Sequence, residues 1–195
     1  ACSIPPFSLS NEIINSIKKF SIHLAEELKT IGLMNVQYAI KDEQIYILEA
    51  NPRASRTIPF LAKAIGIPFI RIAAELIAGK SLSEELIEFK PEKLPYFAIK
   101  EAVFAFNKFP NTDVILGPEM KSTGEVMGID ESFDMAYLKS QIGAGQKLND
   151  IKNIFISVRD EDKEEISDKD KLLTENDYNL YTTKGTYHFL SKKNI

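Results

Sequence analysis

The stretch "ILEANPRASRTIPF" (Ile47–Phe60) begins as an apolar strand and becomes polar within three residues. Upstream, the β-rich runs "NVQYAI" (Asn35–Ile40) and "IYILEA" (Ile45–Ala50) flank the polar segment "KDEQ". Two such runs around a short polar turn are typical of a β-hairpin. The sequence therefore predicts a hairpin whose second strand ends in a cluster of polar side chains.

A hairpin centred on Glu43 would make Gln37 the direct cross-strand partner of Glu49, about 5 Å away at Cβ. Side chains alternate between the two faces of a strand, so Ile47 and Asn51 are expected on the Glu49 face. The cluster of Gln37, Glu49 and Asn51 would offer oxygen atoms with one formal negative charge. Such a set suits Mg²⁺ or Mn²⁺, which prefer oxygen ligands and share them with substrate phosphates.

Two arginines, Arg53 and Arg56, follow the strand. Their planar, permanently charged side chains can hold a phosphate or a carboxylate. Together with a divalent cation they supply the parts that phosphoryl transfer requires. The spacing alone is equally consistent with a surface network of ion pairs between Glu49 and the arginines.

The composition narrows the function classes. The 195 residues are 44% hydrophobic and carry a net charge of −4, which attracts neither nucleic acid nor an anionic membrane. The single cysteine, Cys2, excludes an internal disulfide and suits a reducing compartment. The most apolar region, residues 58–78, contains Lys63, Arg71 and Glu75, unlike a membrane span. We expect a cytoplasmic protein with no nucleic-acid or membrane partner.

Local patterns predict the remaining elements. Apolar residues at helical spacing, with Ser8 or Ser10 as the cap, indicate a helix from about Asn11 to Lys29. Further along, the sequence predicts two short helices bracketed by proline and glycine, at residues 59–66 and 68–79. A region of strands and loops is expected at residues 91–128, and another helix at 131–145.

A new unit is expected from residue 151 onward. The strand "NIFISVRD", an acidic stretch, the strand "YNLYTT" and the short helix "KGTYHFLSKKNI" follow one another. This order predicts a parallel βαβ unit. We therefore expect an α+β or α/β chain of two domains, residues 1–150 and 151–195.

Several long strings resemble the large subunit of carbamoyl-phosphate synthase. They include "GLMNVQYAIKDEQIYILEANPRASRTIPFLAKAIGIPF", "VILGPEMKSTGEVMGIDESFDMAYLKSQ" and "FISVRDEDKE", and the resemblance extends over essentially the whole chain. It implies the C-terminal lobe of the second ATP-grasp domain, followed by a truncated methylglyoxal-synthase-like regulatory domain. We expect the residues that bind adenine to lie upstream of Ala1, and the isolated chain to be inactive.

The resemblance also implies an activity. The second half of this family's large subunit phosphorylates carbamate with ATP to give carbamoyl phosphate. The whole synthesis uses bicarbonate, ammonia or glutamine, and two ATP, and it feeds arginine and pyrimidine biosynthesis. The implied cofactors are ATP and Mg²⁺ or Mn²⁺, with K⁺ as a further candidate. The implied partners are a glutaminase subunit and the remainder of the large subunit.

The family's site residues map onto this sequence individually. Its metal ligands correspond to Gln37, Glu49 and Asn51, and its phosphate- and carbamate-side arginines correspond to Arg53 and Arg56. These are the residues that the hairpin pattern selects on its own. Another family-like string, "STGEVMG", contains a glutamate, Glu125, which in the family lies near the route of carbamate between active sites. A packing role for this residue is an equal alternative.

The regulatory domain of the family holds a nucleotide phosphate in a "T-x-G-T" turn, present here as Thr183, Gly185 and Thr186, and Lys163 matches a lysine near the effector. Taken alone, "TTKGT" favours an ordinary strand-to-helix turn; the resemblance reverses that preference. The neighbouring segment "ISDKDKLLTENDY" is more polar than the first helix of the family's domain.

Two other functions fit parts of the sequence. Another ATP-grasp carboxylate ligase, or a biotin carboxylase, would share the Glu-x-Asn strand end, although "NPRASRT" followed by "SVRDEDK" argues against it. A non-catalytic, split or truncated chain with a regulatory or assembly role is the second alternative.

Overall fold

The computed structural model describes residues 1–82, 94–104, 106–108, 113–115, 117–147 and 151–194. The chain folds as two compact units, Ala1–Gln146 and Lys147–Ile195. The predicted domain boundary after residue 150 and parts of the predicted strand-and-loop region 91–128 lie outside the described residues. Among the helices that the structure describes, none is both long enough and apolar enough to cross a membrane.

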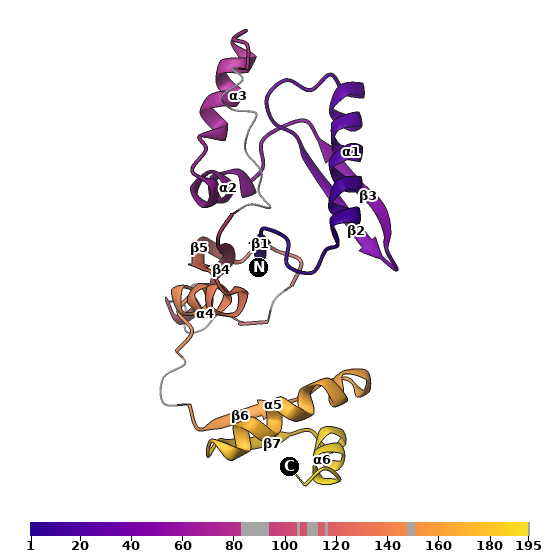
Figure 1. Cartoon of the computed structure of the whole chain (residues 1–195). Helices are drawn as coiled ribbons and strands as arrows, with labels where there is room; N and C mark the ends of the chain where they lie inside the picture. The colour runs from indigo at the N-terminus through magenta and orange to yellow at the C-terminus, as the bar shows by residue number, and fades with distance from the viewer. Residues whose placement is uncertain (83–93, 105, 109–112, 116, 148–150, 195) are drawn as a thin grey trace. The chain divides into compact units, whose positions relative to one another are not determined.

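The first unit combines a hairpin with a separate three-stranded antiparallel sheet of order β1-β4-β5 (Figure 1). The predicted hairpin and helices are confirmed, with shifts of a few residues at their ends. The strands are β1 (Cys2–Ile4), β2 (Asn35–Lys41), β3 (Gln44–Asn51), β4 (Phe97–Phe104) and β5 (Ser122–Asp130). The helices are α1 (Asn11–Glu27), α2 (Thr57–Ile65), α3 (Phe69–Ile77) and α4 (Phe133–Gly143), with a 3₁₀ turn η3 (Phe106–Lys108).

Helix α1 begins where the sequence predicts and lies alongside the hairpin (Figure 1). The Ser10 hydroxyl accepts a hydrogen bond from the backbone N–H of Ile13 at 3.3 Å, as expected of an N-cap. The hydroxyls of Ser21 on α1 and Tyr38 on β2 are hydrogen-bonded at 2.8 Å. The hairpin face that carries Tyr38 is therefore the face toward α1.

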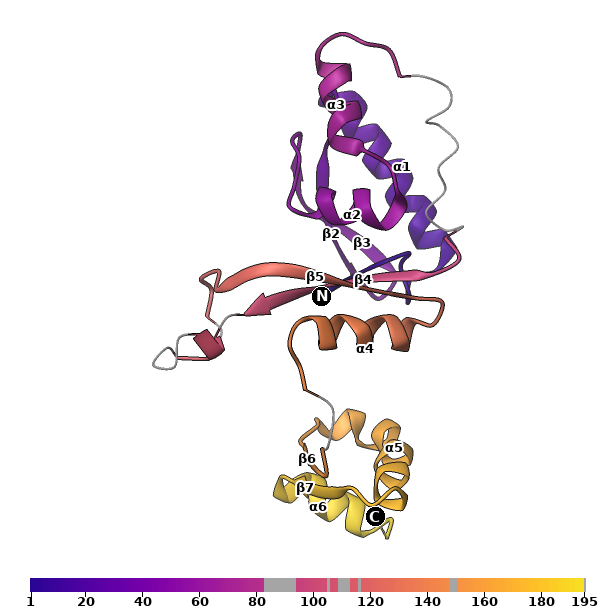
Figure 2. The ribbon, with the colours of Figure 1, turned by 90° about the vertical axis from the view of Figure 1, so that its left-hand side faces the viewer.

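The three-stranded sheet has a helix on each side (Figure 2). Phe60 and Ala64 of α2 are buried against Ala98 of β4, and Met127 of β5 packs on the same cluster. The next residue of β5, Gly128, points to the opposite side, because successive strand residues alternate between faces. Helix α4 packs on that side.

The contact between α4 and β5 depends on the absence of a side chain at Gly128. A Cβ atom there would lie 2.1 Å from the carbonyl oxygen of Ala136 and 2.5 Å from the backbone nitrogen of Ser140. Both α4 residues are fully buried. Because the atoms in the way belong to the helix backbone, no change of side-chain rotamer can make room for a methyl group.

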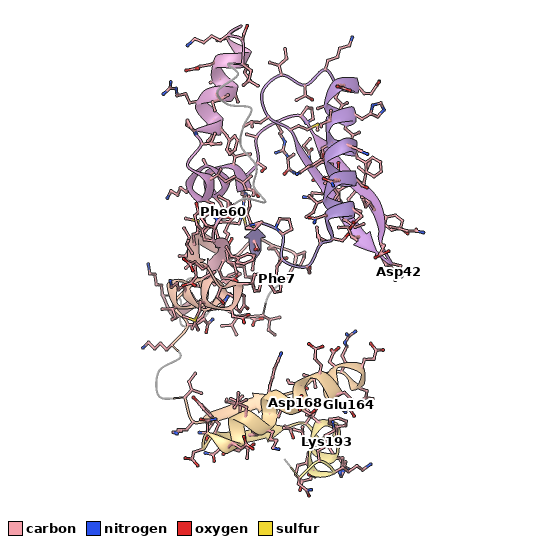
Figure 3. The ribbon with its side chains drawn as sticks, in the orientation of Figure 1. Phe7, Asp42, Phe60, Glu164, Asp168 and Lys193 are labelled. Atoms are coloured by element: carbon pink, nitrogen blue, oxygen red, sulfur yellow. The ribbon has the colours of Figure 1, made fainter. Side chains whose placement is uncertain are left out.

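The second unit is the predicted parallel βαβ arrangement, and its strand pairing confirms that prediction. Helices α5 and α6 contact each other, and a salt bridge joins Glu164 of α5 to Lys193, which follows the end of α6; both residues are labelled in Figure 3. The elements are β6 (Asn153–Ile156), the 3₁₀ turn η4 (Asp160–Asp162), α5 (Lys163–Glu175), β7 (Asn179–Thr182) and α6 (Lys184–Ser191).

Helix α5 buries a carboxylate. Asp170 is 0% exposed, and neither of its side-chain oxygens has a hydrogen-bond partner among the residues that the structure describes. Burial raises the pKa of Asp170, because desolvation disfavours the charged form. The polar residues noted in the sequence of this helix thus include one, Asp170, that lies on its buried side.

We predict that Gly128→Ala lowers the free energy of unfolding by about 3 kcal/mol, because α4 must move off β5 to admit the methyl group. Gly124→Ala is the matched control on the same strand, since a Cβ atom there would meet no atom of the other described residues, its chain neighbours aside, within 4 Å. Urea denaturation monitored by circular dichroism measures both. Equal stabilities for the two variants would contradict the close approach at Gly128.

We predict that Asp170→Ala raises the free energy of unfolding by about 2 kcal/mol at pH 7, because it removes a buried carboxylate that has no hydrogen-bond partner among the described residues. With its pKa raised on folding, Asp170 destabilises the native state as the pH rises through that pKa. The gain should therefore shrink as the pH falls through the unfolded-state pKa of about 3.9, because Asp170 then becomes protonated in the unfolded state as well as in the folded state.

Asp168→Ala on the exposed side of α5, labelled in Figure 3, controls for helix propensity in this comparison. Urea denaturation at pH 7 and at about pH 3.5 supplies the measurement. A gain that is equal for both variants, or independent of pH, would show that burial of Asp170 carries no penalty.

Candidate functional site

The hairpin turns through two residues, Asp42 and Glu43, whose φ angles are 50° and 60°. Positive φ at both central residues is typical of a type I′ turn. Lys41 pairs with Gln44 across it, and Asp42 lies at the tip of the hairpin (Figure 3). The hairpin is therefore centred between Asp42 and Glu43, and the predicted centre at Glu43 is wrong by half a residue.

A β-bulge corrects the register further along the hairpin. Tyr38 pairs with Ile47, but Gln37 pairs with Glu49, so Leu48 is an extra residue on β3 without a direct partner. The predicted pairing of Gln37 with Glu49 is confirmed, although it arises from the bulge and not from a symmetric turn.

The bulge also decides which side chains share a face. Direct partners lie on the same face, and the consecutive residues Gln37 and Tyr38 lie on opposite faces. Glu49 therefore lies on the same face of the hairpin as Gln37, while Ile47 lies with Tyr38 on the face toward α1. The expectation that Ile47 shares the Glu49 face is wrong, and the polar cluster lies on the face away from α1.

The structure brings the three predicted oxygen donors together. Asn51 donates a hydrogen bond through Nδ2 to Oε1 of Glu49 at 3.0 Å, and Glu49 stands directly opposite Gln37. Gln37 and Glu49 are exposed and Asn51 is half-buried. Within the described residues no three His, Cys, Asp or Glu side chains gather as a metal site, so Glu49 stands as a single carboxylate among amides.

This donor set fits a divalent cation that is shared with a substrate. One carboxylate and two amide oxygens match the preference of Mg²⁺ or Mn²⁺ for oxygen ligands. A single negative charge leaves most of the charge of the cation for other ligands, such as phosphate oxygens. Rotation of the Asn51 amide by about 180° would turn Oδ1, in place of Nδ2, toward the Glu49 side.

The two arginines lie on the loop that leaves β3. The backbone N–H of Arg53 donates to the carbonyl of Asn51 at 2.8 Å, and its guanidinium donates to the carbonyl of Ala54 at 3.1 Å. Arg56 immediately precedes α2, and its guanidinium contacts the sulfur of Met120. Both arginines are exposed.

In the described part of the chain, neither guanidinium contacts Glu49 or pairs with any carboxylate. The alternative interpretation of the sequence, a network of ion pairs between Glu49 and the arginines, therefore does not form there. The structure puts Arg53 next to the polar cluster along the chain, but it does not join either arginine side chain to that cluster.

Arg56 lines a hollow of about 390 Å³ together with Pro59, Met120 and residues 122–125 of β5. One of the lining residues is Glu125, which forms an ion pair of 2.9 Å with Lys100 on β4. Glu125 was singled out from the sequence, but Lys100, whose side chain is only 16% exposed, was not. Lys100 can be found once β4 is paired with β5. It then lies directly opposite Met127, and Glu125, two residues from Met127, is on the same face and within its reach.

The second unit brings the four predicted effector residues together at one edge of its sheet. A Cβ atom on Gly185 would lie 3.4 Å from Nζ of Lys163, so the ammonium group lies against this turn. The hydroxyls of Thr183 and Thr186 are 3.2 Å apart. Thr186 and Lys163 are buried, whereas Thr183 and Gly185 are exposed.

The electrostatics of this turn favour an anion. Thr183 is the N-cap residue of α6, and its own side chain makes no capping hydrogen bond. The first backbone N–H groups of α6 and the Lys163 ammonium thus lie at the same edge, where the carboxyl ends of the parallel strands meet. Lys163 donates to Oδ1 of Asp160 at 2.5 Å, and this bond lowers the pKa of Asp160.

Asp160 was not predicted from the sequence. Its only signal there is a spacing of three residues from Lys163, which is common in an acidic stretch and selects no single carboxylate.

Comparison with known proteins assigns the chain to a family. Residues 3–85, which contain the whole hairpin and both arginines, match the family "Carbamoyl-phosphate synthase L chain, ATP binding domain". The full chain is 48% identical to a carbamoyl phosphate synthase large chain of Neisseria meningitidis, of which it covers 18%.

Two further relatives are named as the C-terminal section of the carbamoyl phosphate synthase large chain. The protein from Aquifex aeolicus is 46% identical over the full chain, which covers 39% of it. The protein from Methanocaldococcus jannaschii is also 46% identical over the full chain, which covers 33% of it. The chain thus spans well under half the length of these relatives. It belongs to the family of carbamoyl phosphate synthase large chains, of which it matches one segment.

Proposed function

We propose that the first unit supplies the metal-binding and phosphate-facing side of a site where ATP phosphorylates carbamate to carbamoyl phosphate. The observation that carries the proposal is the oxygen cluster on the hairpin, where Glu49 faces Gln37 and accepts a hydrogen bond from Asn51. This cluster falls within the residues that match an ATP-binding domain.

The residues of this chain would act by position and charge. Gln37, Glu49 and Asn51 would hold Mg²⁺ or Mn²⁺, which supplies Lewis-acid neutralisation of phosphate oxygens when it is bound. Arg53 and Arg56 are free of carboxylate partners among the described residues, so each can turn toward the transferring phosphoryl group or carbamate. No covalent nucleophile is needed, because phosphoryl transfer responds to alignment and charge stabilisation.

This reaction would be one step of the complete synthesis from bicarbonate, ammonia or glutamine, and two ATP, which feeds arginine and pyrimidine biosynthesis in the cytoplasm. The relatives are far longer than this chain. We assign adenine binding to the rest of a large chain and ammonia supply to a glutaminase subunit. Potassium is a further candidate cofactor.

For the second unit we propose a regulatory role as the first part of a methylglyoxal-synthase-like domain. The supporting observation is the convergence of Lys163, Thr183, Gly185 and Thr186 at the start of α6. A buried ammonium group, a glycine-bearing turn and helix N–H groups together suit the phosphate group of an effector.

We predict that Glu49→Gln lowers the rate of ATP formation from carbamoyl phosphate and ADP by about 100-fold and raises the Mn²⁺ concentration required. The assay uses a large chain that contains this segment. Glu43→Gln is the matched control, because it removes the same charge from the turn of the same hairpin. If Glu49→Gln retained the rate and metal requirement of the control, the metal assignment would be wrong.

We predict that Lys163→Gln weakens the binding of inorganic phosphate to the second unit about tenfold or more, because it removes the buried ammonium at the Gly185 turn. A phosphate titration of the 195-residue chain, followed by the NMR signal of the Gly185 amide, measures the affinity. Lys171→Gln, an exposed change on the same helix, serves as the control. Equal affinities in the two variants would contradict a phosphate site at Lys163.

A further inference from the structure

The charge of the buried Lys163 ammonium is satisfied by an exposed carboxylate. The Lys163 side chain is 10% exposed, whereas that of Asp160, its partner at 2.5 Å, is 94% exposed. A buried ammonium needs a counter-charge or strong hydrogen-bond acceptor nearby, because desolvation disfavours its charged form. In the part of the unit that the structure describes, Asp160 is the carboxylate that fulfils this need.

The neighbouring acidic residues have different partners. Glu161 and Asp162 form ion pairs with Arg159, at 3.6 Å and 3.0 Å. Glu164 pairs with Lys193. Among the described residues, Asp160 therefore stands apart from this acidic stretch as the one carboxylate turned to the lysine at the Gly185 turn.

An incoming phosphate and Asp160 would compete for the same ammonium group. The space beside Gly185 reaches Nζ of Lys163, since a Cβ there would lie 3.4 Å from it. A phosphate in the turn would place a charged oxygen at the ammonium, where a carboxylate oxygen already lies. Two anions at one ammonium repel each other, so binding of the phosphate must weaken or break the bond to Asp160.

Displacement of Asp160 is structurally easy. Its side chain is almost fully exposed on the short turn η4, so it can rotate into water without opening a cavity. The hydrogen bond from Lys163 lowers the pKa of Asp160, so this carboxylate is held in its charged form while it is the partner of the lysine.

We propose that Asp160 competes with the effector phosphate for Lys163. In the free protein its carboxylate pairs with the Lys163 ammonium, and this ion pair raises the phosphate concentration needed to fill the site. This inference rests on the proposed phosphate site of the second unit. It assigns to Asp160 an action through Lys163, without contact to the effector.

The test is a phosphate titration of Asp160→Asn, with Asp162→Asn as the matched control. Both substitutions remove one negative charge from η4, but only the first removes the partner of Lys163. We expect Asp160→Asn to bind inorganic phosphate about fivefold more tightly than the unaltered chain, in line with an ion pair whose carboxylate is exposed. Asp162→Asn should change the affinity by less than about twofold, through long-range charge alone.

A double-mutant cycle shows whether Asp160 acts through the lysine. In a Lys163→Gln background, Asp160→Asn should no longer tighten phosphate binding. A nucleoside 5′-monophosphate and the corresponding nucleoside extend the titration. The nucleotide should show the same gain of about fivefold and the nucleoside none, which separates recognition of the phosphate group from recognition of the base.

The outcomes separate this inference from the site on which it rests. If the unaltered chain binds phosphate through Lys163 but Asp160→Asn and Asp162→Asn have equal affinities, the competitor role is wrong and the site remains. If none of the variants binds phosphate, Asp160→Asn included, both are wrong. If the gain of Asp160→Asn persists in the Lys163→Gln background, Asp160 acts by some other route and the inference also fails.

Discussion

The β-bulge at Leu48 is the constraint on which the hairpin site depends. If the register between the turn and the bulge continued, Leu48 would stand opposite Gln37, and Glu49 opposite Val36. Glu49 would then face α1 with Tyr38, and its carboxylate would meet the helix. One extra residue moves Glu49 and Asn51 to the other face, where they join Gln37. The chemistry of this end of the hairpin thus follows from a single irregularity in the backbone.

The strength of this site depends on what surrounds it. Glu49 is exposed, and a carboxylate in water attracts a cation far less than one in a dry cleft. The strand end carries one negative charge and the loop that follows it carries two guanidiniums, so this segment has a net positive charge unless an anion is present. The arrangement therefore favours a cation that arrives with phosphate oxygens over a cation alone. This preference agrees with a family whose matched segment is an ATP-binding domain.

Local patterns in the sequence predicted α1 with Ser8 or Ser10 as its cap, the hairpin, and the parallel βαβ unit, because these elements are encoded by periodicity, caps and turns; the structure selects Ser10. The bulge gave no signal, since Ile47 and Leu48 are both apolar and either could follow the alternation. Gly128 looks like an ordinary strand glycine until α4 is seen to rest on it. The polarity of α5 was visible, but only the fold shows that Asp170 is buried while Asp168 is exposed. The pattern pointed to Gln37, Glu49 and Asn51, whereas the grouping of Lys163 with the Gly185 turn came from family resemblance alone.

Both candidate sites hold their charged group in a hydrogen bond that a ligand must replace. On the hairpin, the Asn51 amide occupies one oxygen of Glu49, and in the second unit Asp160 occupies the ammonium of Lys163. The affinity of each site is then a difference between two interactions, not the strength of one. The two exchanges differ in kind: Asn51 can turn its own oxygen toward the cation and remain a ligand, whereas Asp160 carries the same sign of charge as its competitor and must withdraw. The first exchange adds an oxygen ligand for the cation as the site fills, and the second removes a carboxylate that accepts from Lys163. A substitution at Asn51 should therefore weaken its site, while a substitution at Asp160 strengthens the other.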